Sequence, residues 1–183
     1  MALTPTIYRV SIHLAHIDRG CYEHLQATVA RHPSETAERL VARLLAYALC
    51  YEPDLVFTKG IAAGDEPDLW RKGGDGRVEL WLEVGLPDPE RLLKAARHAS
   101  RVILLASGNG RWRWESAHLA RLAAVPNLRI YGLDYAFVQQ VAARLQRSIE
   151  WSVTVTDGTL YLNIGEGTLE TTVHVLAAGA DAD

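Results

Sequence analysis

The continuous apolar run RVILLAS at residues 101–107 is the feature that most restricts the fold of this chain. Strands that are covered on both faces carry such runs, and they occur mainly in parallel sheets whose strands are joined by helices. A shorter run of the same kind, NLRIYGL, follows at residues 127–133, and each run is followed by a helical pattern. The middle of the chain is therefore predicted to be an α/β arrangement, with a sheet flanked by helices.

The two ends of the chain predict strands of another kind. Residues 6–17 alternate between apolar and polar side chains, and the same two-residue period returns after residue 148. Asp157-Gly158 separates two of these late segments and is a strong hairpin signal. We expect the N-terminal strand to pair with the C-terminal ones, because strands at the edge of a sheet need partners.

Helices and strands are also predicted between these regions. Apolar residues at three- and four-residue steps predict an amphipathic helix over residues 34–50. Residues 54–59 and 78–84 read as strands, and we expect them to be neighbours in one sheet. A further helix should begin at about Pro89, with Asp88 as its N-cap.

Composition limits the class of protein. With 183 residues, 49% of them hydrophobic, the chain should form a single domain over residues 1–183 with a real core. The net charge of −3 excludes a global positive field for nucleic acid or anionic lipid, so any such contact must be local. Cys21 and Cys50 lack the spacing of a zinc site or a redox pair, and no signal or membrane segment is visible, so a reducing, cytoplasmic location is expected.

One acid stands inside an apolar strand, in the segment GDEPDLWRKGGDGRVELWLEVG at residues 64–85. Strand alternation places Glu83 on the same face as Trp81 and Gly85. Burial of a lone carboxylate would cost several kcal/mol unless it is paired, hydrogen-bonded, protonated or bound to a cation. Because Gly85 has no side chain, it leaves room beside Glu83 for an ion, a substrate or a long side chain.

A second acid is positioned to meet Glu83. The turn KGGDG should fold the chain back on itself and bring residues 65–70 beside residues 80–85. Asp68 would then approach Glu83, and two carboxylates form a suitable seat for Mg²⁺ or Mn²⁺. The alternatives are a structural buried carboxylate for Glu83 and a solvated loop acid for Asp68.

Four segments in order, ARHPSETAERLVARLLAY, FTKGIAAGDEPDLW, LWLEVGLPD and LLKAARHA, resemble the YaeQ family of small bacterial proteins. That family is described as a variation on the PD-(D/E)xK nuclease fold. The resemblance implies a mixed central sheet flanked by helices, to which the N- and C-terminal antiparallel strands would be added. It also implies an acid from the first helix, the PD aspartate, the (D/E) acid and a lysine around a divalent ion.

The motif residues are carried over individually. Pro67-Asp68 matches the PD element, and Glu83 matches the (D/E) position. The lysine position falls on Gly85, which departs from the pattern. In several branches of the superfamily the following helix supplies this lysine, so Lys94 would be the substitute, although a solvated charge is the simpler interpretation of Lys94.

The first-helix acid is chosen by helix geometry. At 100° per residue, Glu38 lies at the border of the apolar stripe, and Glu35 lies farther toward solvent. We therefore expect Glu38 to be the acid that assists, although amphipathic helices commonly carry such border acids for solubility alone.

Weaker signals lie at residues 107–116. GRWRWES interleaves Arg111, Trp112, Arg113 and Trp114, the chemistry needed to stack on bases and touch phosphates, although tryptophans are also ordinary core residues and this second interpretation is slightly favoured. The preceding SGNG turn lies where α/β proteins bind anions, but it carries neither a full GxGxxG motif nor a P-loop lysine.

Three hypotheses for function follow. The first is a nuclease-like enzyme in which Asp68 and Glu83 hold Mg²⁺ or Mn²⁺, Glu38 assists and Lys94 orients the attacking water. The second is a protein of the same fold that binds nucleic acid or a transcription-associated protein without cutting. The third is a small-molecule anion site at SGNG near Arg111.

Overall fold

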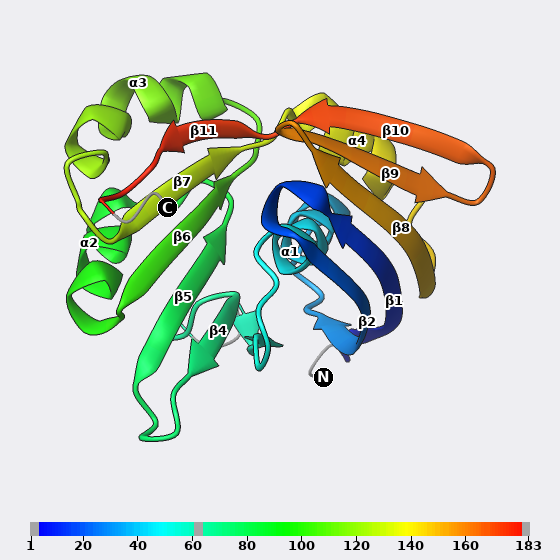
Figure 1. The fold of residues 1–183 in the computed structure, drawn as a ribbon, viewed down its shortest axis with the longest axis horizontal. Coiled ribbons are helices and arrows are strands. Elements are labelled where there is room, and N and C mark those ends of the chain that lie inside the picture. Colours follow the sequence, from blue (N-terminus) through cyan, green and yellow to red (C-terminus); the bar gives the residue numbers. More distant parts are fainter. Residues whose placement is uncertain (1–3, 61–63, 181–183) are drawn as a thin grey trace.

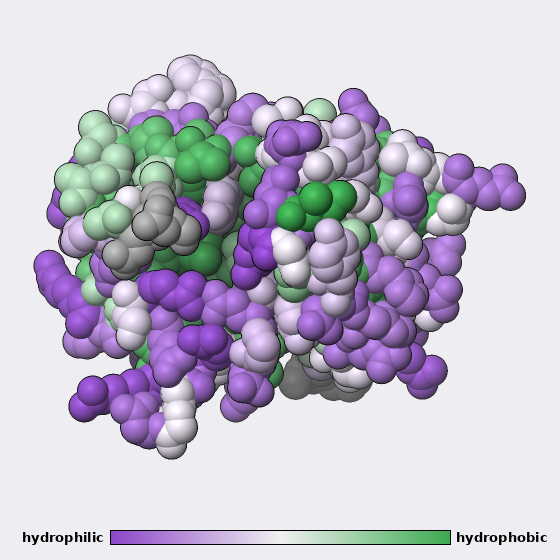
Figure 2. All heavy atoms as spheres, in the orientation of Figure 1, coloured by the Kyte–Doolittle hydropathy of each residue, from purple (hydrophilic) through white to green (hydrophobic). Residues whose placement is uncertain are grey.

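The computed structural model describes residues 4–60 and 64–180, which form a mixed α/β fold with two sheets (Figure 1). The five-stranded sheet has the strand order β10-β9-β8-β1-β2. Its strands are β1 (Thr6–His16), β2 (Cys21–Arg31), β8 (Ser148–Thr156), β9 (Thr159–Ile164) and β10 (Gly167–Thr172). Hydrophilic residues cover most of the surface over β1 and β2, so this sheet buries one face and leaves the other in water (Figure 2).

The six-stranded sheet has the order β11-β7-β6-β5-β4-β3. Its strands are β3 (Val56–Phe57), β4 (Leu69–Lys72), β5 (Val78–Val84), β6 (Arg101–Ala106), β7 (Leu128–Gly132) and β11 (His174–Ala177). Strands β5, β6 and β7 are parallel, whereas β3, β4 and β11 run antiparallel to their neighbours.

Four α-helices and one short 3-10 helix, η1 (Ile17–Arg19), complete the described structure. The α-helices are α1 (Ala37–Leu49), α2 (Pro89–His98), α3 (Arg111–Leu122) and α4 (Tyr135–Ala142). Within the described residues, none of these helices has both the length and the apolar character that crossing a membrane requires.

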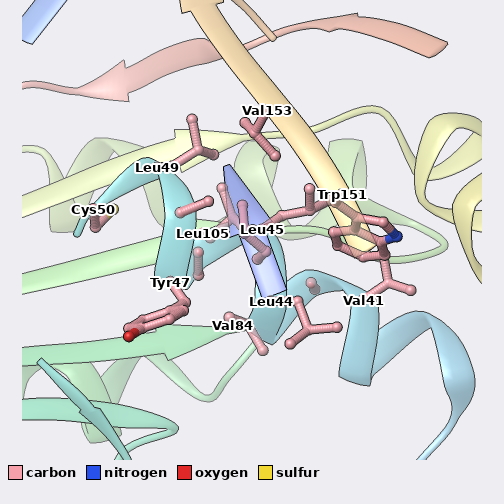
Figure 3. Close-up of a cluster of buried hydrophobic side chains, with 14 of the residues drawn as sticks. Val41, Leu44, Leu45, Tyr47, Leu49, Cys50, Val84, Leu105, Trp151 and Val153 are labelled. Carbon is pink, nitrogen blue, oxygen red and sulfur yellow. The ribbon is translucent and has the colours of Figure 1, made fainter. Parts of the chain in front are cut away.

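Helix α1 lies between the two sheets (Figure 1). Its N-cap is Thr36, whose hydroxyl accepts a hydrogen bond from the Arg39 N–H. Every residue from Leu40 to Leu49 is buried. The same core cluster contains Trp151 of the five-stranded sheet and Leu105 of the six-stranded sheet (Figure 3). The helix is apolar nearly all round because both sheets cover it.

A second core fills the opposite face of the six-stranded sheet. It joins Leu92 of α2 and Trp114 of α3 to Val102, Leu104 and Ile130 of the strands beneath them. Strand β6 is therefore covered on both faces, as its continuous apolar run predicted.

Several predicted elements are confirmed. Strand β1 pairs with β8 in parallel, and Asp157-Gly158 forms the β8–β9 hairpin turn. Asp88 caps α2, because its Oδ1 accepts the Glu90 N–H at 2.8 Å. The end strands, however, form a second sheet with their own face on α1 and do not extend the central one.

Two expectations about strands need correction. Residues 54–59 and 78–84 are not neighbours, because β4 lies between β3 and β5. The long strand β2 was not predicted at all: it is an edge strand that buries only Leu25 and Val29, so it lacks a clear apolar period.

Candidate functional site

A cavity of about 510 Å³ opens where the parallel strands β5 and β6 end. Ligands of α/β proteins commonly bind at the carboxyl ends of such strands. Its charged lining residues are Glu38 and Arg39 of α1, Glu66 and Asp68 of the loop before β4, Glu83 of β5 and Arg91 of α2. We refer to this site as the acidic cavity.

Asp68 is fixed by the backbone of β5. Its N–H donates to the Leu82 carbonyl at 3.1 Å, and its Oδ2 accepts from the Val84 N–H at 2.9 Å. Its Oδ1 accepts from the Arg39 guanidinium at 2.7 Å. The side chain is only 3% exposed, so these bonds replace most of its hydration. The expectation that residues 65–70 return beside residues 80–85 is confirmed.

Glu83 is equally buried but is held by side chains. Its Oε1 accepts hydrogen bonds from Trp81 Nε1 at 2.8 Å and from Arg91 Nε at 2.7 Å. No donor among the described residues is bonded to Oε2. Arg91 also donates to the carbonyls of Gly64 and Glu66 at 2.6 and 2.7 Å, and so links α2 to the loop before β4.

Burial is the main cause that raises the pKa of Glu83, and the Asp68 carboxylate adds to the effect. The Arg91 guanidinium and the Trp81 hydrogen bond act in the opposite direction without cancelling it. The influence of Asp68 on the Glu83 pKa is the electrostatic sign that these two acids lie near each other. Glu83 is thus a carboxylate for which a further cation would be favourable.

The two acids at the start of α1 are placed differently from the prediction. Glu35 is 3% exposed, whereas Glu38 is half-buried and lines the acidic cavity. The prediction that Glu35 lies farther toward solvent is wrong because α1 begins at Ala37, so the helical angle does not apply to Glu35. Both carboxylate oxygens of Glu35 accept from Arg43, at 3.2 and 3.1 Å.

Lys94 does not join the other predicted residues. Its side chain is exposed, lies one turn beyond Arg91 on α2 and does not line the acidic cavity. The space expected beside Gly85 is present, because a Cβ built there would meet no heavy atom within 4 Å. The structure therefore brings together Glu38, Asp68 and Glu83, and Arg91 is the cation nearest to Glu83.

The sequence analysis missed the arginines of this site. A signal for Arg91 existed, because Pro89 starts α2 and residue 91 therefore falls in the first turn, beside the end of β5. No comparable signal existed for the contact of Arg39 with Asp68, which joins residues 29 positions apart in the sequence.

The predicted RWRW contact surface is only half available. Trp114 is 8% exposed, donates from Nε1 to the Pro87 carbonyl and packs in the core under α3, so it cannot stack on a base as predicted. Arg111 is paired with Glu115 and Asp134. Trp112 is 66% exposed, and the Arg113 guanidinium lies over its ring.

The donor chemistry of the acidic cavity suits a hard divalent cation. Four carboxylates line it against two guanidinium groups, and Mg²⁺ commonly uses only one or two carboxylates while keeping several waters. No group of three acid, histidine or cysteine side chains within residues 4–60 and 64–180 is close enough to hold a metal alone. Because Arg39 and Arg91 already contact Asp68 and Glu83, an ion would compete with these arginines.

The fold and this cavity define a two-sheet α/β protein with a buried acid pair at its strand ends. The family model described as YaeQ protein matches residues 1–173. YaeQ proteins of Salmonella typhi and Escherichia coli (strain K12) are 36% and 34% identical to the chain over 171 residues, which cover 93% of this chain and 94% of each relative. The chain belongs to the YaeQ family.

Crystal structures agree with this assignment. The YaeQ protein from Xanthomonas axonopodis pv. citri has a TM-score of 0.91 at 34% identity and covers 95% of this chain and 99% of its own. The YaeQ protein from Pseudomonas syringae has a TM-score of 0.89 at 38% identity and covers 94% and 96% of the two chains.

Proposed function

We propose that this protein is a divalent-metal-dependent phosphodiesterase of the PD-(D/E)xK nuclease type. The observation that carries the proposal is the convergence of Asp68 and Glu83, from adjoining segments of one sheet, on a cavity whose lining acids outnumber its arginines. The parallel strands flanked by helices and the Pro67-Asp68 step before β4 support the same class. The proposed location is the bacterial cytoplasm.

The residues of the acidic cavity divide the work. Asp68 and Glu83 would hold Mg²⁺ or Mn²⁺, with Glu38 at the edge of the site. When bound, such an ion supplies a water of lowered pKa and offsets the charge that grows on the phosphate. Arg91 takes the role that the sequence assigned to Lys94: its planar guanidinium suits two oxygens of a phosphate, and its stem starts from the first turn of α2.

Nucleic acid is the proposed source of the phosphodiester. Ser107 and Gly108 line the acidic cavity, and α3 begins directly after that turn. The exposed Trp112 and Arg113 of its first turn offer a ring for base stacking and a charge for the backbone. This contact is local, as the net charge of −3 requires.

Substitution Glu83→Gln should abolish Mn²⁺ binding in a calorimetric titration and cleavage of labelled single-stranded DNA or RNA. Glu79→Gln is the matched control, because Glu79 lies on the same face of β5 but outside the cavity, paired with Arg71. Because the pKa of Glu83 is raised, protons compete with the ion, and wild-type binding should strengthen as pH rises from the acid range toward neutrality. Equal Mn²⁺ binding by wild type and Glu83→Gln would contradict the proposed site.

A second candidate function is nucleic-acid binding without cleavage on the same fold. It is favoured by Gly85 at the lysine position and by the guanidinium groups that already neutralise Asp68 and Glu83. Binding of labelled nucleic acid that is unchanged by EDTA, together with no Mn²⁺ binding by the folded wild type, would select this alternative.

Substitution Arg91→Gln should tighten Mn²⁺ binding by about tenfold and slow cleavage. A charge-assisted hydrogen bond contributes about 1.5–3 kcal/mol, and an ion that no longer displaces Arg91 from Glu83 gains part of it. Lys94→Gln, on the same helix with an exposed side chain, should change neither quantity. Loss of cleavage in Lys94→Gln alone would return the cationic role to Lys94.

A further inference from the structure

A second cavity, of about 630 Å³, lies between the two sheets. It is lined by the ends of β1 and α1, by the first residues of β6 and β7 and by the β8–β9 turn. The acidic cavity is lined by the start of α1 and this second cavity by its end, so the two are separated by the length of that helix. We call the second site the intersheet cavity, and Figure 1 shows α1 between the sheets that form it.

His16 lines the intersheet cavity with an unsatisfied polar atom. The residue is 7% exposed, and its Nδ1 has no hydrogen-bond partner in the described parts of the chain. An unpaired buried polar atom costs about 1–3 kcal/mol, which a ligand able to bond it would recover. Burial lowers the pKa of His16 and the nearby Arg19 lowers it further, so the imidazole is neutral at pH 7.

The charged groups of this cavity favour an anion. Three arginines line it, Arg19, Arg101 and Arg129, against the two acids Asp18 and Glu52. Both acids are already engaged: Glu52 accepts from Arg101, and Asp18 accepts the N–H groups of the β8–β9 turn. A guanidinium has five N–H donors, and Arg19 uses two of its own on the carbonyls of Leu49 and Tyr51.

The remaining walls are mostly apolar. Leu49, Val102, Leu128 and Val155 contribute buried side chains, and Val175 contributes an exposed one. Green hydrophobic atoms lie among purple polar ones over β6 and β7 in Figure 2. Pockets for small molecules commonly have volumes of about 300–1,000 Å³ and combine apolar walls with a few polar groups. The intersheet cavity has this size and this composition.

We propose that the intersheet cavity binds a small amphipathic anion. Its apolar body packs on the valine and leucine walls, and its carboxylate, sulfonate or phosphate head group lies toward Arg19 and His16. This site is independent of the acidic cavity and of the phosphodiesterase proposal, because it uses the opposite charge and the other end of α1.

The probe for this site is 8-anilinonaphthalene-1-sulfonate, with N-phenyl-1-naphthylamine as its uncharged counterpart. Fluorescence titration of the folded protein should show one saturable sulfonate site, with at least tenfold weaker binding of the uncharged probe. Equal affinity for both probes, or no saturable binding, would overturn the proposal.

Two sets of variants locate the binding. His16→Ala should weaken binding of the sulfonate at least fivefold, whereas His13→Ala should not, because His13 is on the same strand but stacks on His24 outside the cavity. Val175 is 63% exposed at the lining, so Val175→Glu and Val175→Lys can be compared without disturbing the core. Glutamate should weaken binding relative to lysine by at least fivefold, and equal binding by this pair would refute the anion site even if His16→Ala proved unstable.

Discussion

Replacing Arg43 with methionine should lower the free energy of unfolding by about 3–5 kcal/mol, since it leaves a buried carboxylate without its main partner. Arg43 is 2% exposed and Glu35 is 3% exposed, and the guanidinium donates to both Glu35 oxygens. Arg39 also contacts Glu35 at 3.2 Å, but its side chain is 28% exposed and shared with Asp68. Urea denaturation of both proteins at pH 7 measures the loss.

The double variant Glu35→Gln/Arg43→Met is the control for this prediction. It removes both charges, so most of the stability should return, because replacing a buried ion pair by neutral groups is often close to neutral. The difference between the single and double variants then measures the unpaired charge. A loss below about 1 kcal/mol for Arg43→Met would mean that water reaches Glu35, because exposed pairs contribute at most that much.

The arginines explain how two acids are kept close in this fold. Arg39 contacts both Glu35 and Asp68, and Arg43 lies 3.9 Å from Asp68, so one network joins the start of α1 to the segment before β4. Arg91 does the same for Glu83 from α2. The acid pair is therefore held by three cations from two helices, which is the arrangement that a bound divalent ion would have to replace in part.

The acids could be predicted from the sequence because local rules place them. The two-residue period of β5 and the KGGDG turn are enough to bring Asp68 beside the end of β5. The arginine partners come from helices whose side-chain directions depend on packing, so their contacts have no local signature. Lys94 and Arg91 are separated by one helical turn, and only the measured start of α2 shows which one reaches Glu83.

The fold shows the same division between local and long-range information. Strand β6 and helix α1 were predictable because their apolar patterns are continuous or periodic. Strand β2 was not, since an edge strand with one face in water buries few residues, and β4 was not, since its four residues are too short for a pattern. Nor does any local rule tell that the end strands form a separate sheet around α1, because that depends on which face of the helix is left to cover.

Substitution Leu45→Ala should lower the free energy of unfolding by about 2–5 kcal/mol, as expected for a large residue in a closed core. Leu45 is completely buried on α1, in the cluster that contains Trp151 of one sheet and Leu105 of the other (Figure 3). Because this helix contacts both sheets, the cavity left by alanine weakens both together. Hydrogen exchange of amides in β1 and β6 should accelerate by a similar factor in the two strands.

Leu92→Ala is the matched control for this coupling. Leu92 is also completely buried, but it lies in the second core, between α2 and the outer face of the six-stranded sheet. If residues 1–183 fold as the single domain predicted from the sequence, this distant cavity should accelerate exchange in β1 as well as in β6, because both strands exchange through the same global unfolding. Exchange that accelerates only in β6 for Leu92→Ala, while Leu45→Ala affects both strands, would contradict a single domain: the two sheets would then be separate folding units joined only by α1.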